Sequence, residues 1–266
     1  MKIIFLGSGT SSGVPVIKCS CLVCSSKDEK DRRMRASILV EKRKRIVIDT
    51  GPDFRFQMLE HSIQNLDAAL YTHLHYDHIG GMDDLRPFSL NDKQAFPVWA
   101  DKKCRDEIIN KYSYVEQTAG KISNRLPNLQ INILKSDKEG EFAPFNIGDI
   151  EIQPVRLVHA PQISLDSVGF IFDKKFGYLT DFKTINAEDE KYLYNLKLLV
   201  LGAPLPFETS THISMEQAKA LIHKFRPERA FITHISHDVL HRNLEKNLSS
   251  DAPPIYPAYD GLSLFL

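Results

Sequence analysis

The feature that most constrains this chain is the segment 71–81, with the sequence YTHLHYDHIGG. It gathers three imidazoles and one carboxylate within six residues: His73, His75, Asp77 and His78. The run before it, residues 66–71, is mostly apolar and predicts a buried strand, and the glycine pair at its end allows a sharp turn. These side chains therefore belong at the mouth of a strand-to-loop connection, which a rigid scaffold holds and solvent reaches.

The spacing within this segment is that of metal ligands. Alternate residues of extended backbone point the same way, so His73 and His75 are placed to share one ion. Asp77 and His78 point apart from that pair and are candidates for a second ion. Imidazole and carboxylate together suit zinc, with manganese or iron as alternatives. A satisfied polar turn is the competing interpretation, and it gives no reason for so many titratable groups.

Composition limits the class of protein. The 266 residues suffice for one large domain or two small ones, and 42% hydrophobic residues support a full core. Lys+Arg and Asp+Glu both number 34, which weighs against nucleic acid as a partner without excluding it. The apolar N-terminal run is too short for a signal peptide, and no stretch reaches membrane-spanning length. We expect a soluble, cytoplasmic protein with no membrane partner.

Three of the four cysteines, Cys19, Cys21 and Cys24, lie within six residues. This cluster fits metal binding in a reducing compartment better than a disulfide framework. Tetrahedral zinc needs a fourth ligand from elsewhere in the chain, and three free buried thiols are the alternative. Cys104 stands alone in a charged helical stretch and is predicted to take no part.

The N-terminal strand, residues 2–6, runs into a loop rich in glycine and hydroxyl groups at residues 7–16. Its backbone amides are placed to approach a phosphate, although a plain turn explains the composition equally well. The loop lacks the Gly-Lys-Ser/Thr ending of a Walker sequence.

Alternating strands and helices are predicted along the whole chain. A hairpin is expected from residues 36–40 and 45–49, a helix over 54–61 capped near Asp53, and a helix to about 112 capped by Asp101. Residues 113–130 are polar and irregular, typical of a flexible lid. Further strands are predicted over 96–100, 130–134, 141–147, 150–159, 167–172, 176–180, 198–201 and 229–233. Further helices are predicted over 188–196, 214–225 and 237–248, followed by an edge strand over 259–266.

Three more residues of metal-ligand type follow apolar runs: His159, Asp181 and His234. With the segment 71–81, four strand ends carry such side chains. This arrangement indicates strands of a layered α/β fold that deliver ligands to one edge.

This series of motifs resembles the metallo-β-lactamase superfamily, from residue 2 to about residue 241. The resemblance implies one domain over residues 1–266, a four-layer αβ/βα sandwich of two mixed sheets flanked by helices. It also implies a centre of two divalent ions, Zn²⁺ or Mn²⁺, bridged by Asp181. One ion would be held by His73, His75 and His159. The other would be held by Asp77, His78 and His234.

The sequence Gly-Val-Pro-Val followed by Cys-x-Cys-x-x-Cys is similar to that of the PhnP-type cyclic phosphodiesterase group. This resemblance implies a structural zinc loop at about residues 17–27, in which His237 completes the cysteine site. It also implies that Asp77 and His212 are catalytic, with His212 as the proton donor. His223 and His241 match nothing in the pattern and are expected at the surface.

We therefore expect a metal-dependent hydrolase that cleaves a small phosphodiester, cyclic ones included. Two ions roughly 3.5–4 Å apart would share and activate a hydroxide and neutralise the phosphodiester oxygens. His212 would protonate the leaving alkoxide. The expected partner is this small-molecule substrate, and a homodimer is compatible with the sequence.

Other functions stay open because superfamilies share a metal core across chemistries. They are a tRNA-processing ribonuclease, a lactonase, thioesterase or glyoxalase-type hydrolase, a PqqB-type protein of quinone-cofactor biosynthesis, and a non-catalytic metal-binding protein. The short interval from His159 to Asp181 leaves no room there for a long tRNA-gripping arm.

Overall fold

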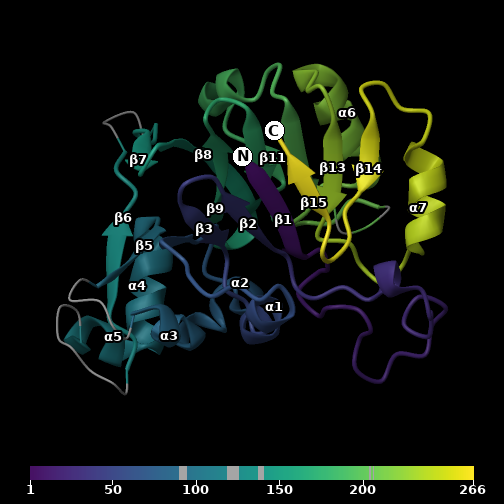
Figure 1. The fold of residues 1–266 in the computed structure, drawn as a ribbon. Coiled ribbons are helices and arrows are strands. Elements are labelled where there is room, and N and C mark those ends of the chain that lie inside the picture. The colour runs from purple at the N-terminus through teal and green to yellow at the C-terminus, as the bar shows by residue number, and fades with distance from the viewer. Residues whose placement is uncertain (90–94, 119–125, 137–140, 204, 206) are drawn as a thin grey trace.

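Two mixed sheets form the centre of the molecule in a computed structural model that describes residues 1–89, 95–118, 126–136, 141–203, 205 and 207–266 (Figure 1). The first sheet has the strand order β15-β1-β2-β3-β4-β5-β6. Its strands are β1 (Lys2–Gly7), β2 (Ser37–Glu41), β3 (Arg45–Ile48), β4 (Ala68–Leu70), β5 (Phe96–Ala100), β6 (Leu129–Ile133) and β15 (Ser263–Phe265).

The second sheet has the order β11-β8-β9-β10-β12-β13-β14, and β7 pairs with β8 outside this path. Its strands are β7 (Phe145–Ile147), β8 (Ile150–Ala160), β9 (Leu165–Phe172), β10 (Phe176–Leu179), β11 (Thr184–Ile185), β12 (Leu198–Gly202), β13 (Ala230–Thr233) and β14 (Ile255–Pro257).

Helices cover the outer faces of both sheets. The α-helices are α1 (Phe54–Glu60), α2 (Tyr76–Ile79), α3 (Arg86–Ser89), α4 (Lys102–Lys111), α5 (Ser113–Thr118), α6 (Met215–Phe225) and α7 (His241–Leu248). The 3₁₀ turns are η1 (Glu29–Asp31), η2 (Met82–Leu85), η3 (Pro161–Ile163) and η4 (Ala187–Tyr192). Figure 1 shows α4 and α5 on one side of the molecule and α6 and α7 on the opposite side.

Three apolar layers hold these elements together. One lies between the sheets and includes Phe5 and Phe170. A second joins the outer face of the second sheet to α6 and α7, and a third joins the first sheet to α1 and α4. Strands such as β12 are buried on both faces, which explains their unbroken apolar runs. The predicted four-layer α/β sandwich is confirmed.

The local signals at two helix starts are confirmed. The Asp101 carboxylate accepts a hydrogen bond from the backbone N–H of Cys104 at 2.7 Å, which caps α4. Ser214 caps α6 in a reciprocal capping box with Gln217. Asp53 does not cap α1, because its carboxylate is bound to the Arg35 side chain and backbone instead.

Several predicted elements are shorter than expected. The segment predicted as a helix over 188–196 is the 3₁₀ turn η4, where the buried Asp189 carboxylate accepts from the backbone N–H of Arg156 at 2.6 Å. The predicted strand 141–147 is ordered as a strand only in β7. The last helix begins at His241 instead of 237, because the ring of His237 packs against the cysteine cluster and the Val239 carbonyl accepts from Arg33.

The edge strand predicted over 259–266 is present as the shorter β15, at the edge of the first sheet, and a second short strand, β14, precedes the predicted range. β14 pairs with β13 in the second sheet, and β15 pairs with β1 in the first. The chain crosses between the sheets at Asp260, whose carboxylate accepts from Ser8 and Met34.

The lid predicted over residues 113–130 begins with α5, and residues 119–125 lie outside the described part of the chain. Within the described residues, every helix is too short or too polar to cross a membrane.

Candidate metal-dependent active site

The first group of ligand atoms comes from three histidines that two strand ends bring together. His73 and His75 follow β4, and His159 lies at the end of β8. The Nε2 atom of His73 lies 2.9 Å from Nδ1 of His75, and Nε2 of His159 lies 3.3 Å from the same atom. A tetrahedral ion with Zn–N bonds of about 2.0–2.1 Å separates its nitrogen ligands by about 3.3 Å. The three nitrogens therefore fit one ion.

The second group is fully buried: Asp77, His78, Asp181 and His234. The Nε2 atom of His78 lies 3.1 Å from Asp77 and 3.4 Å from Asp181. The Nε2 atom of His234 lies 3.2 Å from Asp181. The four ligand atoms lie within 4.8 Å of one another. The structure thus brings together every residue that the resemblance assigned to the two ions.

A change of backbone conformation between His75 and Tyr76 separates the two groups. His75 is extended, with ψ near 150°, and the helical turn α2 starts at the next residue. Alternation along the extended part points His73 and His75 at one group. The helical turn then rotates Asp77 and His78 toward the other. One short segment therefore serves two sites.

A buried hydrogen-bond network orients the imidazoles, and its central residue, Asp49, was not predicted from the sequence. The Asp49 carboxylate accepts from His78 Nδ1 at 2.7 Å and from the N–H and O–H of Thr72 at 2.8 Å each. Since the Thr72 hydroxyl proton points to Asp49, its oxygen accepts from His73 Nδ1 at 3.0 Å. Both imidazoles thus carry their proton on Nδ1 and turn Nε2 to the site, as metal ligands do. Asp49 follows an apolar strand, so the strand-end rule that selected Asp181 also selects it.

His159 is oriented in the same way by a backbone group. Its Nδ1 lies 3.0 Å from the carbonyl oxygen of Thr211. A carbonyl only accepts, so the proton lies on Nδ1 and Nε2 is left for an ion. The sequence could not reveal this contact, because every residue has a backbone carbonyl group.

Three residues of the site adopt left-handed backbone conformation: Asp49, Asp181 and His234 have φ angles of 64°, 55° and 59°. Non-glycine residues there cost of order 1 kcal/mol or more each. Each follows a buried strand, so the bend aims its side chain across the sheet edge. The hydrogen bonds and packing around these residues keep the backbone in this strained conformation.

Burial and mutual proximity shift the pKa values of these groups strongly. Burial lowers the pKa of His73 well below its usual value. Burial favours the neutral form of Asp181 as well, but the imidazoles of His234 and His78 outweigh it and hold its pKa well below the ordinary range. Burial opposes a charge on His78, yet Asp77, Asp49 and Asp181 together raise the pKa of His78 well above its ordinary value. Perturbation of this kind in a cluster is typical of functional sites.

Several buried nitrogens in the centre lack a hydrogen-bond partner among the described residues, among them Nε2 of His78 and Nε2 of His234. An orphaned buried polar atom costs about 1–3 kcal/mol, so native sites satisfy such atoms. Divalent ions satisfy both atoms, and the mixed nitrogen and oxygen donors suit zinc or manganese. The residues present therefore fit two ions.

His212 lies at the edge of this centre. Its ring packs edge-on against His159 and stacks on His234, with centroid distances of 4.9 and 5.4 Å. Its Nε2 atom is 3.9 Å from Asp181. Burial lowers the pKa of His212 to about 4. The structure thus places His212 beside the predicted ligands His159, Asp181 and His234.

The cysteine cluster forms a separate site. The Nδ1 atom of His237 lies 3.4 Å from Sγ of Cys19 and 3.5 Å from Sγ of both Cys21 and Cys24. Tetrahedral zinc with Zn–S bonds of about 2.3 Å separates S and N by about 3.6 Å, which these distances fit. The backbone N–H of Cys24 and then His237 lower the pKa of Cys21 to about 6, whereas burial first raises that of Cys24 to about 11. A bound cation would favour the ionised form of the Cys24 thiol, against the effect of burial.

Two other histidines were expected at the surface. His223 is half-exposed, but His241 is buried against the ring of Tyr259, and its backbone N–H donates to Asp31. Its position at the start of α7, against the N-terminal loop, explains the burial.

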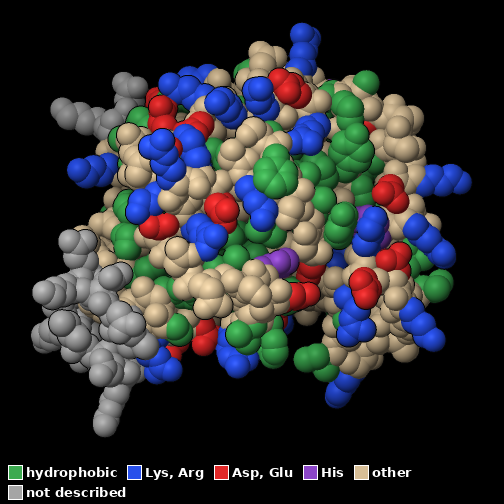
Figure 2. Space-filling model, in the orientation of Figure 1, with side chains coloured by type: hydrophobic (Ala, Val, Ile, Leu, Met, Phe, Trp, Pro, Cys, Tyr) green, Lys and Arg blue, Asp and Glu red, His purple; other side chains and the backbone are tan. Residues whose placement is uncertain are grey.

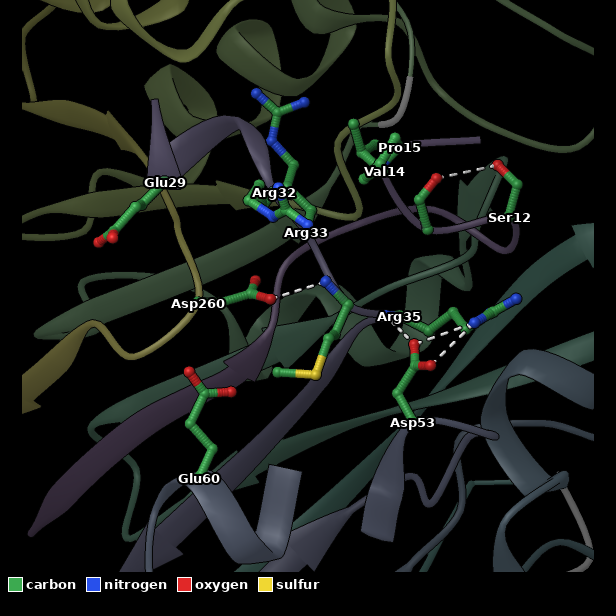
Figure 3. Close-up of a pocket in the computed structure, with 12 residues that line it drawn as sticks. Ser12, Val14, Pro15, Glu29, Arg32, Arg33, Arg35, Asp53, Glu60 and Asp260 are labelled. Carbon is green, nitrogen blue, oxygen red and sulfur yellow. Dashed lines mark hydrogen bonds and ion pairs between the residues drawn. The ribbon is translucent and has the colours of Figure 1, made fainter. Parts of the chain in front are cut away.

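Several backbone donors of the glycine-rich loop over residues 7–16 are already engaged inside the protein. The backbone N–H groups of Gly9, Thr10 and Val14 donate to carbonyl oxygens of neighbouring segments, so they cannot also bind a phosphate. A cavity of about 530 Å³ lies between this loop, α1 and the C-terminal turn (Figure 3). None of the predicted metal ligands lines this cavity, and Figure 3 shows the Asp53 carboxylate directed at Arg35.

Comparison with known proteins agrees with this geometry. The profile described as "Beta-lactamase superfamily domain" matches residues 44–235, more than half of the chain. The chain belongs to the metallo-β-lactamase superfamily. A solved structure described as a new diphosphatase from the PhnP family is 32% identical, with a TM-score of 0.86 over 99% of this chain and 96% of that one. This similarity confirms the expected relationship to the PhnP-type group. Zn²⁺-bound PqqB from Methylobacterium extorquens shares the fold, with a TM-score of 0.76 and 19% identity over the full length of both chains.

A curated relative, the octanoyltransferase of Porphyromonas gingivalis, is 36% identical over the whole of this chain. This chain spans about half of that relative, 52% of its length. The relative's name therefore describes a protein with a second half of similar size.

Proposed function

We propose that this metallo-β-lactamase superfamily hydrolase is a phosphodiesterase that acts on small phosphodiesters, cyclic ones included, at the centre formed by the two ligand groups. The observation that carries the proposal is the placement of His212 against both groups, with its Nε2 3.9 Å from Asp181. The similarity to a PhnP-family diphosphatase over nearly the full length of both chains supports phosphorus chemistry.

The residues of the two groups would hold two divalent ions. Such ions, when bound, lower the pKa of water and neutralise charge on phosphoryl oxygens. The chain's part is to fix the ligand nitrogens. Asp49 and Thr72 keep Nε2 of His73 and His78 directed inward, and Thr211 does the same for His159.

His212 supplies the proton in this proposal. Its low pKa in the free site means that the ring is neutral at rest. The negative charge of a phosphodiester beside the ring favours the imidazolium, as the charge of Asp181 does. The protonated Nε2 then donates to the leaving oxygen as the ester bond breaks, and the ring returns to its neutral form.

The surroundings of the site favour a small substrate. Residues between His159 and Asp181 are taken up by η3, β9 and β10, so no arm for gripping a nucleic acid is inserted there. Acidic and basic side chains are interspersed over the face shown in Figure 2, and the net charge is zero. A broad basic surface for a polyanion is not visible on that face.

A substrate panel tests the proposal. The purified protein, loaded with zinc or manganese, is assayed on bis-p-nitrophenyl phosphate, cyclic nucleotides, lactones and thioesters. We expect cleavage of the phosphodiesters and a catalytic-centre metal content of two ions per chain. Cleavage of the carboxylic substrates alone would overturn the proposal.

Substitution of the proton donor tests its role. His212→Ala should lower turnover of an alkyl phosphodiester about 10²- to 10⁴-fold while metal content is kept. His223→Ala, a half-exposed histidine on α6, is the matched control and should behave as the parent does. Unchanged turnover rules out the proton-donor role, and loss of an ion shows that His212 is a ligand instead.

Hydrolysis of an acyl thioester is the second candidate, and the octanoyltransferase relative is the observation that favours it. The same panel separates the two, because the second candidate predicts turnover of thioesters and none of phosphodiesters.

A further inference from the structure

The turn over residues 208–212, which carries His212, is held by hydrogen bonds to its backbone, whereas the His212 ring has none within the described part of the chain. Within the turn, the Thr209 hydroxyl accepts from the backbone N–H of His212 at 3.0 Å and from that of Thr211 at 3.3 Å. The ring of His212 gains no such support, because its buried Nδ1 has no hydrogen-bond partner among the described residues. Its position therefore depends on ring packing and on where the turn itself lies.

Lys183 anchors this turn. Its ammonium group donates to the carbonyl oxygen of Thr209 at 2.7 Å and pairs with the carboxylate of Glu208. The Lys183 side chain is largely buried, with 19% exposed, whereas that of Glu208 is 53% exposed. The bond to the Thr209 carbonyl is thus the better shielded of the two, and hydrogen bonds from charged donors are the stronger class.

The backbone of Lys183 belongs to the metal-ligand scaffold. It lies two residues after Asp181, and its N–H donates to the carbonyl of Val158 at 2.7 Å, next to His159. One residue thus joins three segments: the end of β8, the segment after β10 that carries Asp181, and the turn that carries His212. The same turn offers the Thr211 carbonyl to His159.

We propose that Lys183 is a positioning residue that locks the turn over residues 208–212 against the ligand scaffold and so places His212 beside the scissile bond. The proposal rests on the phosphodiesterase function proposed above. It assigns Lys183 no contact with substrate. Because a displacement of about 1 Å in a reacting group costs on the order of 10²-fold in rate, loss of the anchor should be felt at the proton-transfer step.

Lys183→Met tests this proposal, since methionine keeps the apolar stem of the side chain and removes the ammonium group. The variant and its parent are compared on two phosphodiesters: one with a p-nitrophenolate leaving group, and a 2′,3′-cyclic nucleotide with an alkoxide leaving group. Only the alkoxide needs a proton. We expect turnover of the cyclic substrate to fall about 10- to 100-fold and that of the nitrophenyl substrate less than about threefold.

Two further variants separate positioning from general instability. Lys183→Arg should recover most of the lost turnover, because a guanidinium also reaches a carbonyl and a carboxylate. Lys224→Met removes an exposed lysine that pairs with Glu190, and it should match the parent on both substrates. Equal losses on both substrates, a loss of metal content, or no loss at all would overturn the proposal.

A measurement independent of turnover distinguishes this proposal from the function on which it rests. The hydrogen-bonded Nδ1 proton of His159 is observable by NMR in the metal-loaded protein. We expect this signal to shift in Lys183→Met, because the hydrogen bond to the Thr211 carbonyl lengthens without breaking, and to keep its position in Lys224→Met. If the parent cleaves no phosphodiester, the proposed function fails, and an unchanged His159 signal in Lys183→Met refutes the anchor.

Discussion

Substitution of Asp49 is the sharpest test of how the chain orients the imidazoles of the candidate metal site. One Asp49 oxygen accepts from the N–H of Thr72, and the other accepts from the Thr72 hydroxyl and from His78 Nδ1. Asp49→Asn keeps the size of the side chain and the first of these oxygens. It replaces the second by an NH₂ group, which cannot accept.

The consequence for His78 follows from hydrogen-bond chemistry. If its proton stays on Nδ1, two donors face each other in a buried site, which costs about 1–3 kcal/mol. If the proton moves to Nε2, the nitrogen directed at the ion is blocked. Both routes weaken binding, and outer partners of metal ligands are worth about 10–100-fold in metal affinity. That range corresponds to about 1.4–2.7 kcal/mol, in agreement with the first figure.

Metal titration measures this effect. Metal-free Asp49→Asn protein is titrated with Zn²⁺ in competition with a chromophoric chelator. The ion at the group of Asp77, His78, Asp181 and His234 should bind about 10–100-fold more weakly, because the change faces His78 directly. The ion at the group of His73, His75 and His159 should be weakened less, because the change reaches His73 only through the Thr72 hydroxyl. Asp67→Asn is the matched control. Asp67 also accepts from a backbone N–H, that of Arg45, but it is partly exposed and contacts none of the predicted metal ligands in its hydrogen bonds. Parental affinity for both ions in Asp49→Asn would refute the role assigned to the network.

Two further predictions concern the scaffold. In Gly51→Ala, a new Cβ would lie 2.0 Å from the backbone oxygen of Asp77, so we expect loss of the ion held by Asp77 and a lower melting temperature, measured by metal analysis and calorimetry. Burial raises the pKa of Asp260 to about 7, so this group keeps its proton in the folded chain to a higher pH than in the unfolded chain. Its contribution to the free energy of unfolding should therefore fall by about 3 kcal/mol as pH rises from 4 to 7. In denaturant unfolding of the metal-free proteins, the free energy of unfolding of the parent should fall by this amount relative to that of Asp260→Asn over the same pH range, and a constant difference would contradict the prediction.

The sequence by itself indicated which side chains gather at the candidate site, and it indicated the layered fold. His73, His75, Asp77 and His78 are neighbours in the chain, and local backbone geometry alone decides how they separate into two groups. The remaining ligands follow apolar runs, because strands of one sheet end at a common edge. The partnership of His237 with the cysteines was indicated only by family resemblance.

Only the tertiary structure decided how these ligands are oriented. Asp49 controls His78 across 29 residues, and Thr211 controls His159 across 52. The partner is a backbone carbonyl in the case of His159 and in that of Lys183, and a carbonyl leaves no mark on the residue type. Likewise, His237 lies outside α7, although the sequence predicted a helix from residue 237, because it meets Cys19, 218 residues away. Local patterns fix which atoms are offered to a site, whereas the packing of distant segments fixes which proton, rotamer and partner each atom has.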